Sequence, residues 1–256
     1  GIFHYETACI QKSLKELKPD IFTDLIAMNA LYRPGPLAYI PNYIARKHGR
    51  EKITYDLEGM DEFLQETYGI TVYQEQVMRL SQKLANFTKG CADVLPKTIK
   101  KKDKKTLDKL KPLFIENATK NGHDAKVLEK VGKDWEAFVS YAFNKSHSTC
   151  YAYVAFQTAY LKAHYPAEYM ASILNHTGSI ESIAFFMEEC KRMGIKVLGP
   201  DINEGFGKFS VMPNGDIRFG MASIKGVGEN VVTALVEERN KNGKFTSVFD
   251  FASRLD

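Results

Sequence analysis

The sequence has only four cysteines, and none of them lies close to another. Disulfide scaffolds and zinc sites normally bring cysteines in short repeats such as C-x-x-C. The wide spacing of Cys9, Cys91, Cys150 and Cys190 therefore argues against both, and it favours a reduced, cytoplasmic setting.

Long apolar runs are also missing. No stretch approaches the roughly 20 apolar residues that a helix needs to span a bilayer. The opening Gly-Ile-Phe-His has neither the basic nor the apolar stretch of a secretory signal. We expect a soluble chain with no membrane partner. Because it starts without Met, directly in patterned sequence, we also expect it to be a segment of a longer protein.

Common catalytic signatures are absent as well. The sequence contains no G-x-S-x-G elbow, no H-E-x-x-H zinc pair and no G-x-x-x-x-G-K-[ST] phosphate loop. We therefore find no self-sufficient catalytic constellation in it.

What is present suffices for a folded protein. The chain has 256 residues, of which 44% are hydrophobic, enough for at least one core and for one or two domains. Its formal net charge of +4 permits binding to nucleic acid without requiring it.

Hydrophobic spacing predicts a mainly α-helical fold. Two long helices are expected, one from Tyr73 to Phe87 and one through residues 151–161. Shorter helices are expected at residues 23–31, ended by Pro34, at residues 166–175, and between Ser179 and Gly194. The stretch before residue 23 is expected to begin as a short strand.

After Pro200 the pattern changes. Residues 208–212 and 216–219 alternate around Pro213-Asn214-Gly215, which indicates a β-hairpin. We expect a small separate unit to begin near this point.

Residues 97–111 are rich in lysine and carry only two acids, Asp103 and Asp108. On a helix these lysines would spread over more than one face, which suits contact with several phosphates. A solvated helix surface explains the run equally well.

Residues 143–151, Phe-Asn-Lys-Ser-His-Ser-Thr-Cys-Tyr, put many hydrogen-bonding groups where a long helix is expected to begin. A helix start offers unpaired N–H groups that attract phosphate, and Lys145 and His147 would add donors. Taken alone, a plain cap by Ser146 or Ser148 explains the pattern better.

Near the C-terminus, Lys225-Gly226-Val227-Gly228 directly precedes another expected helix. The glycines would let the backbone approach a phosphate, as in a helix-hairpin-helix that binds the DNA backbone. A tight turn between helices is the alternative, but the flanking apolar residues favour the DNA-binding interpretation.

Several motifs in register identify the chain as a member of a known family. They are Leu-Tyr-Arg-Pro-Gly-Pro at 31–36, Tyr-Gln-Glu-Gln-Val-Met at 73–78, Phe-Asn-Lys-Ser-His at 143–147, Ala-Tyr-Leu-Lys-Ala-His-Tyr-Pro at 159–166 and Ile-Lys-Gly-Val-Gly at 224–228. In this order and spacing they resemble the α subunits of bacterial DNA polymerase III over essentially the whole chain.

The resemblance implies three parts. Residues 1–31 would be the end of a palm domain, residues 32–205 a helical fingers domain, and residues 206–256 a β-hairpin with the start of a helix-hairpin-helix region. The implied reaction adds a dNTP to a primer 3′ end and releases pyrophosphate, using two Mg²⁺ ions on palm carboxylates. One carboxylate matches Asp24, which would be catalytic and a metal ligand. Two others are expected outside this chain, so the chain alone should be inactive.

The resemblance also implies a set of nucleotide contacts. Basic residues of the fingers would face the triphosphate, and the 144–151 segment resembles a wall of the nucleotide pocket. The candidate nucleotide- and phosphate-binding residues are Arg33, Lys97, Lys101, Lys102, Asn144, Lys145, His147 and Tyr151. Lys225, Gly226, Val227 and Gly228 are the expected DNA contacts.

Some positions depart from the family. Pro96 stands where an Arg is usual and Lys100 where a Gly is usual, which removes a cation and introduces a ring that disfavours a helix. His4 replaces the usual Gln.

The leading hypothesis is a segment of a DNA-directed DNA polymerase that contacts primer–template DNA and the incoming dNTP. The sliding clamp and other replisome subunits would be partners of the full-length protein. A non-catalytic DNA-binding helical module is the main alternative, and a purely structural helical domain is a third. A pair of acids at P-D-x-D spacing upstream in the full gene would favour the enzyme.

Overall fold

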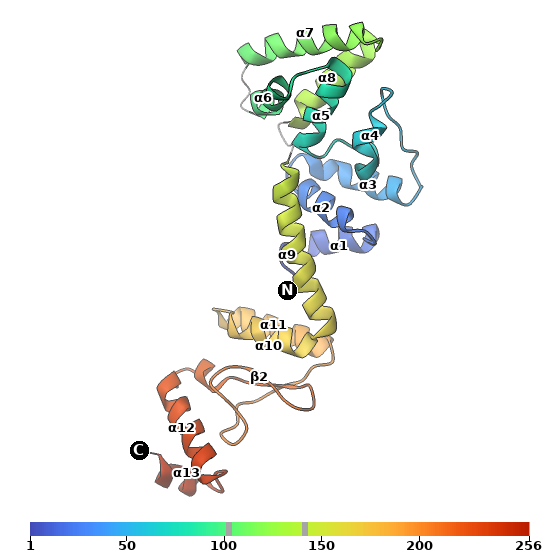
Figure 1. The fold of residues 1–256 in the computed structure, drawn as a ribbon. Helices are drawn as coiled ribbons and strands as arrows, with labels where there is room; N and C mark the ends of the chain where they lie inside the picture. Colours follow the sequence, from blue (N-terminus) through green and yellow to red (C-terminus); the bar gives the residue numbers. More distant parts are fainter. Residues whose placement is uncertain (101–103, 140–142, 256) are drawn as a thin grey trace. The chain divides into compact units, whose positions relative to one another are not determined.

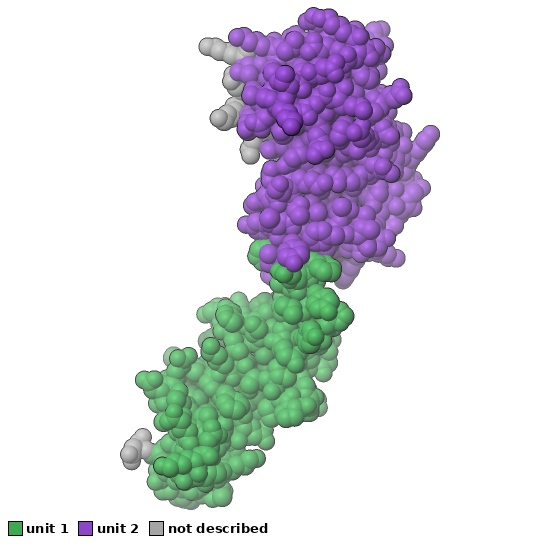
Figure 2. Space-filling model, viewed as in Figure 1, with its two compact units in different colours: residues 1–3, 156–256 green, residues 4–155 purple. Residues whose placement is uncertain are grey.

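The computed structural model describes residues 1–100, 104–139 and 143–255, and these are mainly helical, as the sequence predicts (Figure 1). The chain divides into two compact units, shown in separate colours in Figure 2. Unit 2 contains residues 4–155, and unit 1 contains residues 1–3 with 156–256. The boundary falls within the long helix α9 (Lys145–His164). No helix in the described ranges combines the length and the apolar character needed to cross a membrane.

Unit 2 begins with helices α1 (Ala8–Leu17), α2 (Phe22–Leu31), η1 (Pro36–Tyr39) and α3 (Ile40–Lys47). α2 confirms the helix expected at residues 23–31. The expected strand-like start was wrong, because most of the stretch before residue 18 is helix α1. Ile10 and Leu17, seven residues apart, lie on one face of α1 and are buried.

The rest of unit 2 is a helical cluster, drawn in cyan to yellow-green in Figure 1. Its elements are α4 (Asp61–Leu64), η2 (Gln65–Thr67), α5 (Gln74–Ala85), α6 (Lys89–Lys100), α7 (Lys104–Lys120) and α8 (Ala125–Val139). α5 confirms the helix expected from residue 73. Leu80, Leu84, Phe114, Leu128 and Trp135 are buried in the shared core. Because α5 buries its apolar stripe in this core, its opposite, polar face can line a site.

Unit 1 contains α10 (Pro166–Asn175), α11 (Ile180–Arg192) and a three-stranded sheet of order β1-β3-β2. α10 and α11 confirm the two predicted helices, and the Ser179 hydroxyl accepts a hydrogen bond from the Ser182 N–H, at 3.2 Å. The predicted hairpin is the antiparallel pair β2 (Ser210–Val211) and β3 (Ile217–Arg218). β1 (Val197–Leu198), which the sequence did not predict, pairs with β3 in parallel.

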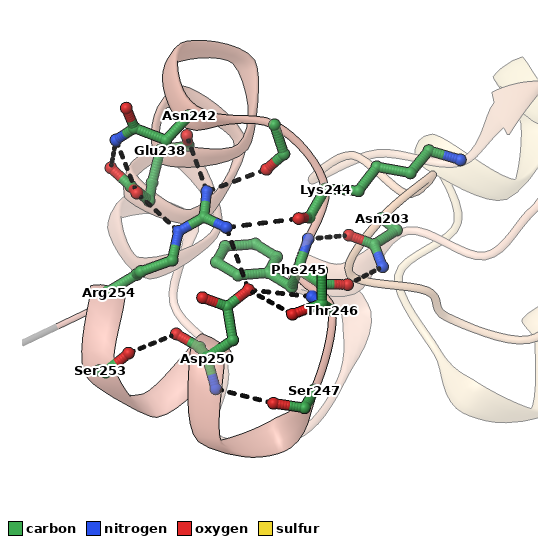
Figure 3. Close-up of polar contacts among 11 residues, drawn as sticks. Asn203, Glu238, Asn242, Lys244, Phe245, Thr246, Ser247, Asp250, Ser253 and Arg254 are labelled. Atoms are coloured by element: carbon green, nitrogen blue, oxygen red, sulfur yellow. Dashed lines mark hydrogen bonds and ion pairs between the residues drawn. The ribbon is translucent and has the colours of Figure 1, made fainter.

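Unit 1 ends with η3 (Met221–Ser223), α12 (Glu229–Asn242) and α13 (Val248–Arg254). Arg254 ties the last two helices together (Figure 3). Its guanidinium pairs with Glu238 at 2.9 Å, donates to the Gly243 carbonyl at 2.9 Å and lies 4.3 Å from the Phe245 ring centroid. A side chain of α13 thus donates to the carbonyl of Gly243, the residue directly after α12.

The expected domain boundaries at residues 31/32 and 205/206 differ from the division into two units. α2 and η1, on either side of residue 32, pack against each other within unit 2. The assignment of residues 1–31 to a palm therefore stays a prediction.

Candidate functional site

The start of α9 meets the start of α5 within unit 2. Tyr73 and Phe143 form a parallel β-bridge, in which the Gln74 N–H donates to the Phe143 carbonyl at 3.0 Å. Two of the sequence motifs, at 73–78 and 143–147, are therefore neighbours in the fold although about 70 residues separate them.

Glu75 caps α9 from the neighbouring helix. Its carboxylate accepts hydrogen bonds from the Lys145 N–H at 3.0 Å and from the Asn144 side-chain amide at 2.6 Å. The Asn144 side-chain oxygen (Oδ1) in turn accepts a hydrogen bond from the His147 N–H at 2.9 Å. Asn144 and Glu75 thus take the capping role expected of Ser146 or Ser148. These first N–H groups of α9 are occupied by protein acceptors.

Lys145 is held by a carboxylate. Its Nζ lies 2.8 and 2.7 Å from the two carboxylate oxygens of Glu66, and 5.5 Å from the Tyr73 ring centroid. A phosphate contact by Lys145, predicted from the sequence, would have to compete with Glu66 for the same charge.

A row of cationic and aromatic groups runs along the first turns of α9. The His147 ring stacks on Tyr151 with centroids 4.4 Å apart, and it meets Phe143 edge-on at 5.1 Å. Arg33 Cζ lies 3.8 Å from the Phe143 centroid. His4, which was not among the site residues predicted from the sequence, meets Tyr151 edge-on, with ring centroids 4.5 Å apart. The structure therefore brings the candidates Arg33, His147 and Tyr151 together.

Asp24 lies in a closed, polar part of the core. Its side chain has 0% exposure and accepts hydrogen bonds from the hydroxyls of Tyr43 at 3.2 Å and Tyr68 at 3.3 Å. Its other oxygen pairs with Lys47, which also pairs with Asp20. Lys47 therefore links an exposed carboxylate, Asp20, to a buried one, Asp24.

The pKa values agree with this arrangement. The hydrogen bond from Lys47 is the main reason that the pKa of Asp20 is lowered. Burial alone would lower the pKa of Lys47, but its hydrogen bonds with Asp20 and Asp24 outweigh that effect and raise it. Burial, and then the charge of Asp24, raise the pKa of Tyr43. Lys47 is thus held as the charged partner of Asp24.

This geometry argues against the predicted metal-ligand role of Asp24. A carboxylate that binds a catalytic ion needs an open side, whereas both oxygens of Asp24 are engaged and buried. Nowhere in the ranges that the structure describes do three or more His, Cys, Asp or Glu side chains form a group that could hold a metal ion.

The lysine-rich segment is described only in part. Lys97 is exposed and pairs with Asp93, one helical turn before it on α6. Lys101 and Lys102 lie outside the described residues. Pro96, which was expected to disfavour a helix, lies buried within α6.

The 225–228 hairpin in unit 1 is open to solvent. Gly226 has a φ of +88°, a conformation that favours glycine, and the Val227 N–H donates to the Ile224 carbonyl at 3.0 Å. Gly228 caps α12 with an ordinary φ of −83°, and a Cβ built on it would meet nothing within 4 Å. Neither the backbone conformation nor packing within the described residues requires glycine at 228. Lys225 beside it is exposed.

Comparison with known protein families gives two matches, one in each half of the chain. The finger domain of the bacterial DNA polymerase III alpha subunit matches residues 1–122, and a helix-hairpin-helix motif matches residues 194–256. A finger domain followed by this motif identifies the chain as part of a DNA polymerase.

The alpha subunits of DNA polymerase III from Vibrio cholerae and Escherichia coli are 45% and 44% identical to this chain over 264 residues. The subunit from Borreliella burgdorferi is 42% identical over 257 residues. These alignments cover 100% of this chain and 22–23% of each relative. The chain belongs to the family of bacterial DNA polymerase III alpha subunits, and it spans less than a quarter of the length of these relatives.

Proposed function

We propose that this chain supplies incoming-nucleotide and DNA-backbone contacts of a replicative DNA polymerase. The full-length protein would add dNTPs to a primer 3′ end on primer–template DNA, in the cytoplasm, with a sliding clamp and other replisome subunits as partners. The observation that carries the proposal is the junction of α5 and α9. It gathers Arg33, His147 and Tyr151 beside a capped, fixed helix start.

The nucleotide would contact both the aromatic and the cationic side chains at this junction. An aromatic and imidazole surface such as His147 on Tyr151 offers a face for a base, and Arg33 offers a guanidinium for a phosphate. Lys97, Asn144 and Lys145 remain proposed contacts, and so do Lys101 and Lys102 on sequence grounds. For Lys145, binding would mean exchanging Glu66 for a phosphate oxygen.

We propose a different role for Asp24 from the one the sequence suggested. Its enclosure and its pair with Lys47 fit a buried anchor that joins α2 to α3. The two Mg²⁺ ions of the polymerase reaction would stabilise the charge of the transferred phosphate. They would be held by carboxylates outside this chain, and the isolated chain would not extend a primer.

The hairpin supplies the DNA-backbone contact. Exposed Lys225 and the open N-terminus of α12 behind Gly228 present a charge and N–H donors to a phosphate. Such contacts carry no sequence information, as a replicative polymerase requires.

The test is binding of the chain to a primer–template duplex over a salt series, with Gly228→Ala as the variant. Ala fits the φ of Gly228 without a clash, so the fold should be unchanged while the added methyl blocks a phosphate. Gly178→Ala in the same unit is the matched control, because a Cβ there also meets nothing within 4 Å. We expect weaker binding by Gly228→Ala alone. Equal binding by both variants would exclude the hairpin as the contact.

A second comparison addresses the lysine-rich segment. Each phosphate that a lysine neutralises adds about −0.9 to the slope of log K against log salt. Changing Lys97, Lys101 and Lys102 together to Ala should therefore lower both affinity and slope. A slope unchanged by the triple substitution would remove these lysines from the interface.

A non-catalytic DNA-binding module is the second candidate. The observation in its favour is that Asp24 is buried and paired, which leaves the chain without an exposed carboxylate at the position predicted for the metal. In the full gene, a pair of acids at P-D-x-D spacing upstream would decide for the polymerase, and their absence would decide for the module.

A further inference from the structure

His4 is held in a backbone conformation that residues other than glycine rarely adopt. Its φ is +62°, in the left-handed region. The residues on both sides of it are anchored. The Phe3 N–H donates to the Thr158 hydroxyl at 3.1 Å. Tyr5 is buried, and its hydroxyl donates to the Leu25 carbonyl at 2.6 Å. A conformation of this kind costs free energy and persists only where the surrounding structure imposes it.

In this conformation the His4 side chain contacts Tyr151. The two rings meet at an angle of 88° with their centroids 4.5 Å apart. His147 stacks on the same Tyr151 ring, with centroids 4.4 Å apart and an angle of 30° between the rings. Tyr151 is half-buried, whereas His4 and His147 are exposed. Two imidazoles from separate segments of the chain therefore contact one tyrosine ring.

These contacts restrict the Tyr151 ring. A tyrosine on the surface of a helix can otherwise turn between side-chain rotamers. An edge-on partner and a stacked partner hold a ring in different ways, and both geometries are favourable for aromatic pairs. A surface that is fixed before its ligand arrives binds more tightly, because binding no longer has to order it. The contact with His4 can therefore raise affinity at the proposed nucleotide surface.

We infer that His4 is a positioning residue for the proposed nucleotide surface. It acts through Tyr151: it holds this ring, and with it the stacked ring of His147, in the orientation that receives the base of a dNTP. The inference rests on the proposed nucleotide site and adds a residue outside the motifs that predicted it. It also gives the left-handed backbone of His4 a role, since that backbone carries the imidazole that contacts Tyr151.

The test uses the variant His4→Asn in the 256-residue chain. Asn tolerates the left-handed region better than most residues, so the backbone should keep its conformation while the ring is removed. Lys18→Asn is the matched control, because Lys18 is an exposed residue of the same unit with a φ of +47°. The ring signals of His147 are followed by NMR, first without ligand and then during addition of a dNTP. Circular dichroism checks that both variants are folded.

Without ligand, we expect His4→Asn to shift the His147 ring signals, because the Tyr151 ring stacked on His147 turns more freely. Lys18→Asn should leave these signals at their wild-type positions. In a Tyr151→Leu background, His4→Asn should cause no further shift. His147 signals that stay in place in His4→Asn would overturn the inference. An equally large shift in the Tyr151→Leu background would also overturn it, because His4 would then act without Tyr151.

With dNTP, we expect His4→Asn to bind about threefold to tenfold more weakly than the wild type, which corresponds to the loss of one aromatic pair. Lys18→Asn should match the wild type. If the wild type binds dNTP and His4→Asn binds it equally well, the inference is overturned while the nucleotide site stands. If both Asn variants bind equally weakly, the effect does not come from the His4 ring, and the inference is again overturned. If the wild type binds no dNTP, the nucleotide site fails and the inference fails with it.

Discussion

The Glu75 carboxylate on α5 accepts a hydrogen bond from the backbone N–H of Lys145, the first residue of α9, at 3.0 Å. A helix start is usually capped by a residue just before it. Here a side chain 70 positions away shares that role with Asn144. The start of α9, and with it the proposed nucleotide surface, is therefore fixed by a contact between two helices.

Loss of this contact should loosen the start of α9. We expect Glu75→Ala to lower the free energy of unfolding by about 1–2 kcal/mol, the range found for lost caps and for hydrogen bonds to charged groups. Urea denaturation would measure it. Glu58→Ala is the control, because Glu58 is an exposed glutamate of the same unit. Equal stability of the two variants would show that Glu75 does not fix α9.

Asp24 is predicted to matter for stability, in buffer without metal. Asp24→Asn removes the charge facing Lys47, whose side chain is only 7% exposed, and should cost roughly 3 kcal/mol. Asp20→Asn should have a much smaller effect, because Asp20 is 77% exposed. The midpoints of urea denaturation of the two variants and the wild type would measure both effects. A metal ligand that plays no part in the core would leave the stability of Asp24→Asn at the wild-type value.

The stability of unit 1 should depend on pH through Glu189. Hydrogen bonds from Arg192, opposed by burial and supported by Lys162, lower the pKa of Glu189 from 4.5 to about 2. A carboxylate with a lowered folded-state pKa stabilises the fold fully above its unfolded pKa. That contribution should be lost as the pH falls from about 4.5 to about 2.

Thermal unfolding between pH 6 and pH 2 would follow this loss. Glu189→Gln should flatten the profile below pH 4.5, whereas Glu188→Gln should not, because Glu188 is 77% exposed and its oxygen lies 3.9 Å from Lys191. Parallel profiles for wild type and Glu189→Gln would contradict the assignment.

Arg254 should hold α13 in place (Figure 3). In Arg254→Lys the positive charge is kept but the fork that reaches Glu238 and the Gly243 carbonyl is lost. We expect faster amide hydrogen exchange in residues 248–254, with exchange in α10 unchanged. Slow exchange throughout α13 in the variant would show that apolar contacts alone suffice.

Much of the fold follows from local patterns. Helices α5, α10 and α11 and the hairpin of β2 and β3 carry their own periodicity, caps and turn residues, so the sequence predicts them. β1 has only two residues and depends on a parallel partner, β3, about 20 residues away. α1 was missed although Ile10 and Leu17 share one face, because polar residues between them hide the pattern.

The candidate site was predicted less completely, for a similar reason. The motifs predicted Arg33, His147 and Tyr151, which the fold brings into one row. Glu66 and Glu75 were missed, because their partner, Lys145, lies 70 or more residues further along the chain. The sequence did indicate that Asp24 is buried. Most residues of α2 are apolar, and an acid within such a helix needs a partner.

The most direct test of the central claim follows the histidine rings by NMR while a dNTP is added to the chain. The chain has six histidines, and His147 stacks on Tyr151 in the proposed nucleotide site. We predict a saturable shift of the His147 ring signals and no shift of His123. If the His147 signals stay in place at millimolar dNTP, the chain does not form the nucleotide surface, and the account of the α5–α9 junction is contradicted.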